Sequence, residues 1–193
     1  MSVIVAFIFL AISIVINYYA GTYATEVASH YVTDIILSNI KTYHIGNFFI
    51  YGSFAFAFAI FIACLYKPNK IPFTLKSIAL FVVIRSIFIS LTHIGPYPTQ
   101  ITIHSGILDK FTFGADLFFS GHTGMPYLIS LVFWEDKLIR YIFLAFSGIF
   151  AVVVLLAHLH YSIDVLAAFF ITYTIYDIAT RIFKKDRKIS LEN

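Results

Sequence analysis

Hydrophobic and polar positions follow one another along this chain in long blocks. Six apolar runs are long enough to cross, or nearly cross, a hydrocarbon core of about 30 Å: residues 3–19, 46–66, 74–92, 117–134, 139–157 and 160–180. Polar and charged residues gather between these runs. The pattern predicts an all-α, polytopic membrane protein with six transmembrane helices, forming a single transmembrane domain over residues 1–193.

Composition strengthens this prediction. Hydrophobic residues make up 60% of the chain and charged residues 12%, with a mean hydropathy of +0.89, whereas about a quarter of the residues in a soluble domain are charged. A transmembrane β-barrel would show alternating segments of about ten residues, and these runs do not alternate. A basic face in polar surroundings is also missing, so we expect no nucleic-acid partner.

Lysine and arginine are distributed unevenly between the two sides of the predicted membrane. With the N-terminus inside, the outer segments carry only Lys41 and Lys110, and the inner segments carry Lys67, Lys70, Lys76, Lys137, Arg140, Arg181, Lys184, Lys185, Arg187 and Lys188. The positive-inside rule then predicts that both termini are cytoplasmic, that residues 184–193 form a basic cytoplasmic tail, and that the loop 93–120 faces outward. The small size and short loops favour a bacterial inner membrane, with the outer face toward the periplasm, or toward a Golgi-type lumen in a eukaryote.

The segment 20–45 is too polar for the hydrocarbon core, yet Val27, Tyr31 and Ile35 recur at helical spacing. We therefore expect an interfacial amphipathic helix there. Glu26, His30 and Asp34 recur at intervals of four and would share one face of it. Three such residues can bind a metal, but we interpret them as the polar face of this helix and predict no metal site.

Two short polar motifs open the fourth and sixth apolar runs at the outer face. Ser120-Gly121-His122 opens the fourth run, and the segment from His160 to Asp164 opens the sixth. Because the fourth and fifth runs form a hairpin, two helix N-termini can meet at one depth. Free N–H groups and the positive end of the helix dipole favour an anion such as phosphate there.

His160 and Asp164 are spaced to lie on one face of a helix. If Asp164 accepts the Nδ1–H of His160, the Nε2 atom is left free to act as a nucleophile or base. His122 can then protonate a leaving oxygen. The alternative is a purely structural hydrogen-bonded pair inside a membrane helix.

Arg85 lies inside the third apolar run, about 12 Å below its outer end. A charge at this depth is costly unless it is paired or lines a polar cavity. Its planar guanidinium can hold two phosphate oxygens. The alternative is a buried ion pair with Asp116 or Asp164.

These motifs resemble those of known lipid enzymes. Ser120-Gly121-His122 and His160-x-x-x-Asp164 resemble the second motif and the end of the third motif of type 2 phosphatidic acid phosphatases. The closer resemblance is to sphingomyelin synthases and related sphingolipid synthases. Their third and fourth motifs are similar to residues 114–123 and 155–165, their second to the stretch from Arg85 to Pro96, and the similarity covers about residues 77–183.

The resemblance implies a six-span fold with its active site on the outer face. It also implies that His160 attacks phosphorus, that Asp164 orients His160, and that His122 protonates the departing group and later activates the incoming hydroxyl. We assign substrate or phosphate binding to Arg85, Asp116, Ser120, Gly121 and Tyr161, and expect no cofactor. The first motif of animal sphingomyelin synthases is absent, and Val153 and Val154 stand where the phosphatase motif has Ser-Arg.

The sequence therefore predicts a phosphotransferase in the membrane. It would move a phospho-head-group from a glycerophospholipid to a lipid hydroxyl, of ceramide or diacylglycerol, through a phosphohistidine. The alternatives are a lipid phosphatase or phospholipase C-type hydrolase that uses the same site, and a transporter or structural membrane protein. No internal repeat supports the transporter.

The remaining polar residues have weaker assignments. We interpret His158 as a supporting or interfacial residue beside His160, and Asp116 as a partner of Arg85, a contact for an amine head group, or a helix cap. His93, His104 and Tyr97 lie in the outer loop, where they line an entrance or are solvated. Asp177 and Arg181 are predicted to pair on the last helix.

Overall fold

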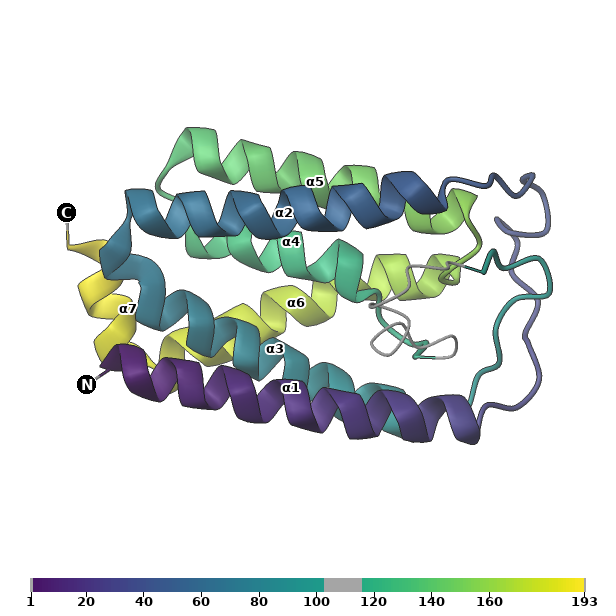
Figure 1. Cartoon of the computed structure of the whole chain (residues 1–193), viewed down its shortest axis with the longest axis horizontal. Coiled ribbons are helices and arrows are strands. Elements are labelled where there is room, and N and C mark those ends of the chain that lie inside the picture. The colour runs from purple at the N-terminus through teal and green to yellow at the C-terminus, as the bar shows by residue number, and fades with distance from the viewer. Residues whose placement is uncertain (1, 103–115, 193) are drawn as a thin grey trace.

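The computed structural model describes residues 2–102 and 116–192, and within these ranges the chain is built from helices and loops without a strand. The elements, in order, are α1 (Ser2–Glu26), α2 (Gly46–Tyr66), the short 3₁₀ helix η1 (Pro68–Lys70), α3 (Ile71–Leu91), α4 (Gly121–Val132), α5 (Lys137–Leu156), α6 (Ser162–Ile182) and α7 (Lys184–Leu191). Figure 1 shows them as an elongated bundle whose two termini lie at the same end.

Five of these helical stretches are long and apolar enough to cross a membrane: α1, α2, η1 with α3, α5 and α6. The prediction of an all-helical, multi-span membrane protein is thereby confirmed. The fourth predicted span, 117–134, is different. Its helix α4 has 12 residues and is therefore about 18 Å long, so it does not cross a core of about 30 Å by itself. The count of six spans stays a prediction, as does the cytoplasmic side of the termini.

Small residues bring α1 and α3 together. The buried positions of α1 include Ala6, Ser13 and Ala20, which are seven residues apart, and also Ala24. This spacing keeps one narrow seam of α1 against its neighbour, and small side chains let two helices approach closely in a membrane. Ala20 and Ala24 pack against Ile89 of α3. The rest of α1 exposes large apolar side chains, as expected for a surface in contact with lipid.

The prediction of an interfacial helix over 20–45 is wrong. Residues 20–26 complete α1, and residues 27–45 form an irregular loop with a turn at 35–39. Glu26, His30 and Asp34 therefore do not share a helix face. The loop instead pairs with the chain after α3, since Ser29 N donates to the carbonyl of His93 (2.8 Å) and Gly95 N donates to that of His30 (3.1 Å). Long-range hydrogen bonds thus replace the local ones that a helix would make.

The C-terminal segment that we predicted to be a basic tail is largely the helix α7. Its Asp186 is buried and lies 2.5 Å from Nζ of Lys76 in α3. Arg187 contacts Glu135 (2.9 Å), whose other carboxylate oxygen lies 3.0 Å from Nζ of Lys70. These pairs attach α7 to the end of the bundle where the termini lie (Figure 1). The predicted pair of Asp177 and Arg181 is confirmed, at 2.8 Å.

Candidate active site

A tight turn joins α5 to α6 and carries His158 and His160. Helix α5 ends in two overlapping bonds, from His158 N to the carbonyl of Leu155 (3.0 Å) and from Leu159 N to that of Val154 (2.8 Å). This is the Schellman arrangement, which places the residue after the cap in the left-handed region. That residue is His158, with φ of 53°, where glycine is usual. The imidazole of His158 must therefore make contacts that offset the strain.

His158 has such contacts. The residue is 3% exposed, and its Nδ1 lies 2.6 Å from Oγ1 of Thr99 and 3.2 Å from Oγ1 of Thr42. The ring of Tyr97 packs edge-on against it, with centroids 5.4 Å apart. Burial lowers the pKa of His158, and the charge of Asp34 opposes this only in part. His158 thus helps to hold the turn, in agreement with a supporting position.

His160 and Asp164 meet as predicted, but not on a helix face. His160 lies two residues before the first residue of α6, whereas Asp164 lies in its first turn. Oδ2 of Asp164 lies 3.2 Å from Nδ1 of His160 and accepts the backbone N–H of Tyr161 at 3.1 Å. Asp164 is fully buried, and its Oδ1 has no partner among the described residues. The pair directs Nδ1 of His160 to the carboxylate and leaves Nε2 with no hydrogen-bond partner in the described part of the chain.

His122 is the second residue of α4. Ser120 caps this helix, because its Oγ accepts the N–H of Thr123 (3.3 Å). The backbone N–H of Ser120 donates to the carbonyl of Asp164 (3.1 Å), which ties the start of α4 to the start of α6. Arg85 lies against Gly121, the residue before His122, since an added Cβ there would be 3.1 Å from its Nε. These contacts bring α3, the start of α4 and the turn before α6 together around His122.

Aromatic rings surround His122 on the side of α2 and α5. The ring of Phe49 lies 4.3 Å from it, centroid to centroid, and that of Phe150 lies 5.8 Å away. Phe49 and Phe150 also pack edge-on against each other at 6.3 Å. Neither residue stands out in the sequence, because one phenylalanine in an apolar run is indistinguishable from its neighbours. The apolar contacts shield His122 from polar surroundings on this side.

Arg85 is paired, as one of the alternatives predicted. Its Nη2 lies 2.7 Å from Oδ2 of Asp116 and donates to the Asp116 carbonyl at 2.9 Å, while Nε donates to the carbonyl of Phe119 at 3.2 Å. The guanidinium lies against Gly121, where an added Cβ would be 3.1 Å from Nε. Nη1 has no partner among the described residues. Arg85 thus fixes the segment before α4, and no described residue uses the two N–H groups of Nη1.

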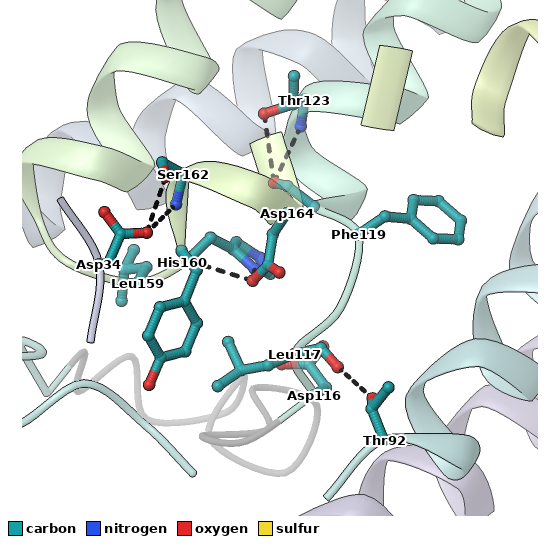
Figure 2. Close-up of polar contacts among 12 residues, drawn as sticks. Asp34, Thr92, Asp116, Leu117, Phe119, Thr123, Leu159, His160, Ser162 and Asp164 are labelled. Carbon is teal, nitrogen blue, oxygen red and sulfur yellow. Dashed lines mark hydrogen bonds and ion pairs between the residues drawn. The ribbon is translucent and has the colours of Figure 1, made fainter. Parts of the chain in front are cut away.

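The two helix N-termini differ in what they can bind. At α6, the N–H of Tyr161 is taken by Asp164, and that of Ser162 is taken by Asp34, whose Oδ2 lies 2.7 Å from the nitrogen. Figure 2 shows His160 between these two carboxylates. At α4, by contrast, no described residue accepts the N–H of Gly121 or of His122. The expectation that both ends bind phosphate is corrected for α6, and α4 keeps its free donors.

Tyr161 is buried and contacts two loops, the one between α1 and α2 and the one after α3. It is 2% exposed, and its hydroxyl donates to the carbonyl of Gly95 (2.8 Å) and lies 3.3 Å from the backbone N of Val32. Its ring packs edge-on against that of Tyr97 at 5.9 Å. The residue links the turn to the loop between α1 and α2 and to the segment that follows α3. A direct contact with substrate stays a prediction.

Other predicted polar residues lie outside this cluster. The carbonyl of His93 bonds to Ser29, and its ring packs against Tyr23 at 6.0 Å. The hydroxyl of Tyr97 lies 2.9 Å from Oγ of Ser38. His104, Lys110, Gly114 and Ala115 lie outside the described residues. No group of three His, Cys, Asp or Glu side chains suited to a metal ion occurs within residues 2–102 and 116–192.

Comparison with known families matches one segment of the chain, which contains His122, His160 and Asp164 but not Arg85. Residues 114–181 match the family model described as PAP2 superfamily C-terminal, a segment that includes α4, α5 and nearly all of α6. The match supports the PAP2 superfamily, whose members are typically phosphatases or phosphotransferases, and hence a membrane enzyme acting on lipids. No curated protein and no solved structure matched the chain.

Proposed function

We propose that this protein transfers a phospho-head-group from a glycerophospholipid to the hydroxyl of ceramide or diacylglycerol, as sphingomyelin synthases do. The observation that carries the proposal is the bond between Asp164 and Nδ1 of His160, 3.2 Å long, which leaves Nε2 of a buried histidine available beside His122. A histidine oriented in this way is a competent nucleophile. The family match supports the reaction class but not the choice of donor or acceptor.

In the first half-reaction, Nε2 of His160 attacks the phosphorus of the donor lipid. An N–P bond forms, the P–O bond to the diacylglycerol breaks, and His122 gives its proton to the departing oxygen. Asp164 keeps Nδ1 protonated and stabilises the positive charge that develops on the ring. In the second half-reaction, His122 takes the proton of the acceptor hydroxyl, whose oxygen attacks phosphorus as the N–P bond breaks.

The negative phosphate oxygens need donors that do not move. We assign this role to the backbone N–H groups of Gly121 and His122 at the start of α4, and to Nη1 of Arg85 beside them. Ser120 supports the site by capping α4. A side chain at Gly121 would press on the guanidinium, since its Cβ would lie 3.1 Å from Nε of Arg85. Asp116 holds Arg85, and in this role it need not touch the substrate.

The experiment is a lipid product analysis by mass spectrometry. Purified protein in mixed micelles receives phosphatidylcholine, phosphatidylethanolamine or phosphatidic acid, each with and without ceramide or diacylglycerol, beside a His160→Ala control. We expect a new phospho-head-group on the acceptor that depends on His160, and a head-group phosphate adduct on the peptide that contains it. Release of phosphate or a phospho-alcohol regardless of acceptor would replace the transferase with a hydrolase. If no donor and acceptor pair gave turnover, the result would indicate that His122 and His160 have structural roles.

A further inference from the structure

We propose that Asp34, in the loop between α1 and α2, is a positioning residue for His160. The inference rests on the proposed function, because it assigns His160 the reacting atom. The Asp34 carboxylate bonds to Ser162, two residues after His160, and not to the imidazole itself. It acts through the backbone of the turn.

Both oxygens of Asp34 accept hydrogen bonds, and Oδ2 makes the contact with Ser162. Oδ2 accepts the backbone N–H of Ser162 at 2.7 Å and its hydroxyl at 2.8 Å. Oδ1 accepts the N–H groups of Ile36 and Leu37 at 2.8 and 3.0 Å. The residue is 7% exposed. Four donors around one buried carboxylate define its position, and through it the position of Ser162. Figure 2 shows the two bonds from Ser162.

The carboxylate is held in its charged form. Burial raises the pKa of Asp34, but hydrogen bonds from Leu37, Ser162 and Ile36 outweigh burial, and the net pKa lies below its ordinary value. A charged acceptor at a helix N-terminus is stabilised by the helix dipole, and its hydrogen bonds are stronger than those of a neutral acceptor. The contact with Ser162 is therefore maintained at neutral pH.

Helix α6 needs this partner because, among the described residues, the only N-terminal N–H that its own first turn satisfies through a side-chain bond is that of Tyr161, which Asp164 accepts. The N-cap residue is Tyr161, whose side chain makes no cap bond, whereas Ser, Thr, Asp and Asn are the usual caps. Asp164 satisfies the N–H of Tyr161, and Asp34 satisfies that of Ser162. The backbone from His160 onward is thus held by one carboxylate from within the helix and another from a distant loop.

Two substitutions test this role. Asp34→Asn keeps one oxygen for Ile36 and Leu37 but turns an amide N–H₂ toward the N–H of Ser162, so the contact with Ser162 is lost. Ser162→Ala removes the hydroxyl bond alone and leaves the backbone bond. The matched controls are Glu26→Gln, at an exposed carboxylate that ends α1, and Thr174→Ala, which deletes a hydroxyl farther along α6.

Two readouts separate positioning from stability. The first is kcat and KM with the best lipid pair, well below the thermal unfolding midpoint of each variant. We expect Asp34→Asn to lower kcat about 100-fold with little change in KM, as a displaced reacting group does, and Ser162→Ala to lower it several-fold. The second is the pair of ring ¹⁵N resonances of His160 in histidine-labelled protein, which report its tautomer without turnover. We expect them to move toward a mixed tautomer in Asp34→Asn.

Each result decides the question. A wild-type protein without turnover would overturn the proposed function, whereas shifted His160 resonances in Asp34→Asn would still support positioning. Wild-type kcat in both variants, with unchanged resonances, would overturn positioning even if the unfolding midpoint falls. If Asp34→Asn does not fold, Ser162→Ala measured against Thr174→Ala carries the test alone, and equal kcat in these two variants would reject the proposal.

Discussion

Arg85 and Asp116 form an ion pair that fixes the entry into α4. Nη2 of Arg85 lies 2.7 Å from Oδ2 of Asp116, and the same nitrogen donates to the Asp116 carbonyl at 2.9 Å. The guanidinium also bonds to the carbonyl of Phe119, one residue before the cap of α4. One side chain of α3 thereby orders the segment that leads to His122.

Asp116→Ala should destabilise the protein by about 1–3 kcal/mol, because it leaves a buried guanidinium without its charged acceptor. A double-mutant cycle with Arg85→Met, followed by chemical unfolding in detergent, should give a coupling free energy of about 0.5–3 kcal/mol.

The control is Asp177→Asn, since the side chains of the pair Asp177–Arg181 are 47% and 73% exposed. That substitution should change stability by less than about 1 kcal/mol. Equal effects at the two sites would contradict the structural role of Asp116.

Asp164→Asn should lower turnover by about 10³–10⁴-fold while leaving the unfolding midpoint near that of the wild type. The amide can still accept the N–H of Tyr161, but it carries no charge to stabilise the imidazolium and does not impose the tautomer of His160. Steady-state lipid turnover and thermal unfolding measure the two effects. A large loss of stability with proportionate loss of activity would instead indicate a structural pair.

Gly124→Ala should destabilise the bundle by about 1–3 kcal/mol through overpacking. A Cβ there would lie 2.6 Å from Oγ1 of Thr172 and 3.0 Å from the ring of Phe81. The matched control is Gly148→Ala in α5, where a Cβ meets nothing within 4 Å and the helix gains up to about 1 kcal/mol. Adding Thr172→Ala to Gly124→Ala should recover part of the loss. Equal unfolding midpoints for the two glycine variants would show that α4 and α6 are farther apart.

His158 should make stability depend on pH. Its pKa is lowered in the folded state from a value of 6.5, so the unfolded chain binds the proton first. The stabilisation that neutral His158 provides is complete above about pH 6.5, and it is lost as the pH falls toward the pKa of His158 in the folded state. His158→Asn, which tolerates the left-handed conformation and does not titrate, should therefore show a flatter decline of unfolding midpoint between about pH 7 and pH 5. His44→Asn is the control for removing an exposed histidine of the first loop, and parallel declines in wild type and His158→Asn would contradict the prediction.

Cysteine labelling tests the predicted orientation of the chain in the membrane. In a Cys64→Ser background, Lys41→Cys and Lys184→Cys place one thiol in the first loop and one in α7, both at exposed positions. The charge distribution predicts that a membrane-impermeant maleimide labels the first variant in intact cells and the second only after permeabilisation. The reverse labelling pattern would show that the proposed active site faces the inner side of the membrane.

Most helices could be predicted from local sequence patterns, because a long apolar run in a membrane has few alternatives to a helix. The exception was the fourth run, where residues 117–120 are not helical and α4 begins only at Gly121. The spacing of four residues correctly predicted that His160 and Asp164 are in contact, but the predicted geometry was wrong. Asp164 lies in the first turn of α6 and bonds to His160 in the turn before the helix, so the two residues do not share a helix face. The pairing of Arg85 with Asp116 was predicted as an alternative from the cost of a buried charge.

The role of Asp34 was not predictable from its neighbours. Helical spacing with Glu26 and His30 suggested an amphipathic helix, but the irregular loop makes its bonds with distant segments. No local signal indicates that Asp34 contacts Ser162, because the contact depends on the arrangement of α1, α3 and α6. Phe49 was missed for a related reason: its contact with His122 comes from the packing of α2, not from a motif.

The contacts around the turn before α6 also bear on how the chain matures. Asp34 and Ser162 are 128 residues apart, and Val32 and Tyr161 are 129 apart. The loop between α1 and α2 is therefore synthesised long before its partner in the turn before α6. A nascent chain that stops after α5 already holds Arg85 and His122, but it lacks His160, the residue that we propose reacts with lipid. We expect lipid chemistry to begin only once the last long helix has entered the bilayer, so that incomplete chains are harmless to the membrane that receives them.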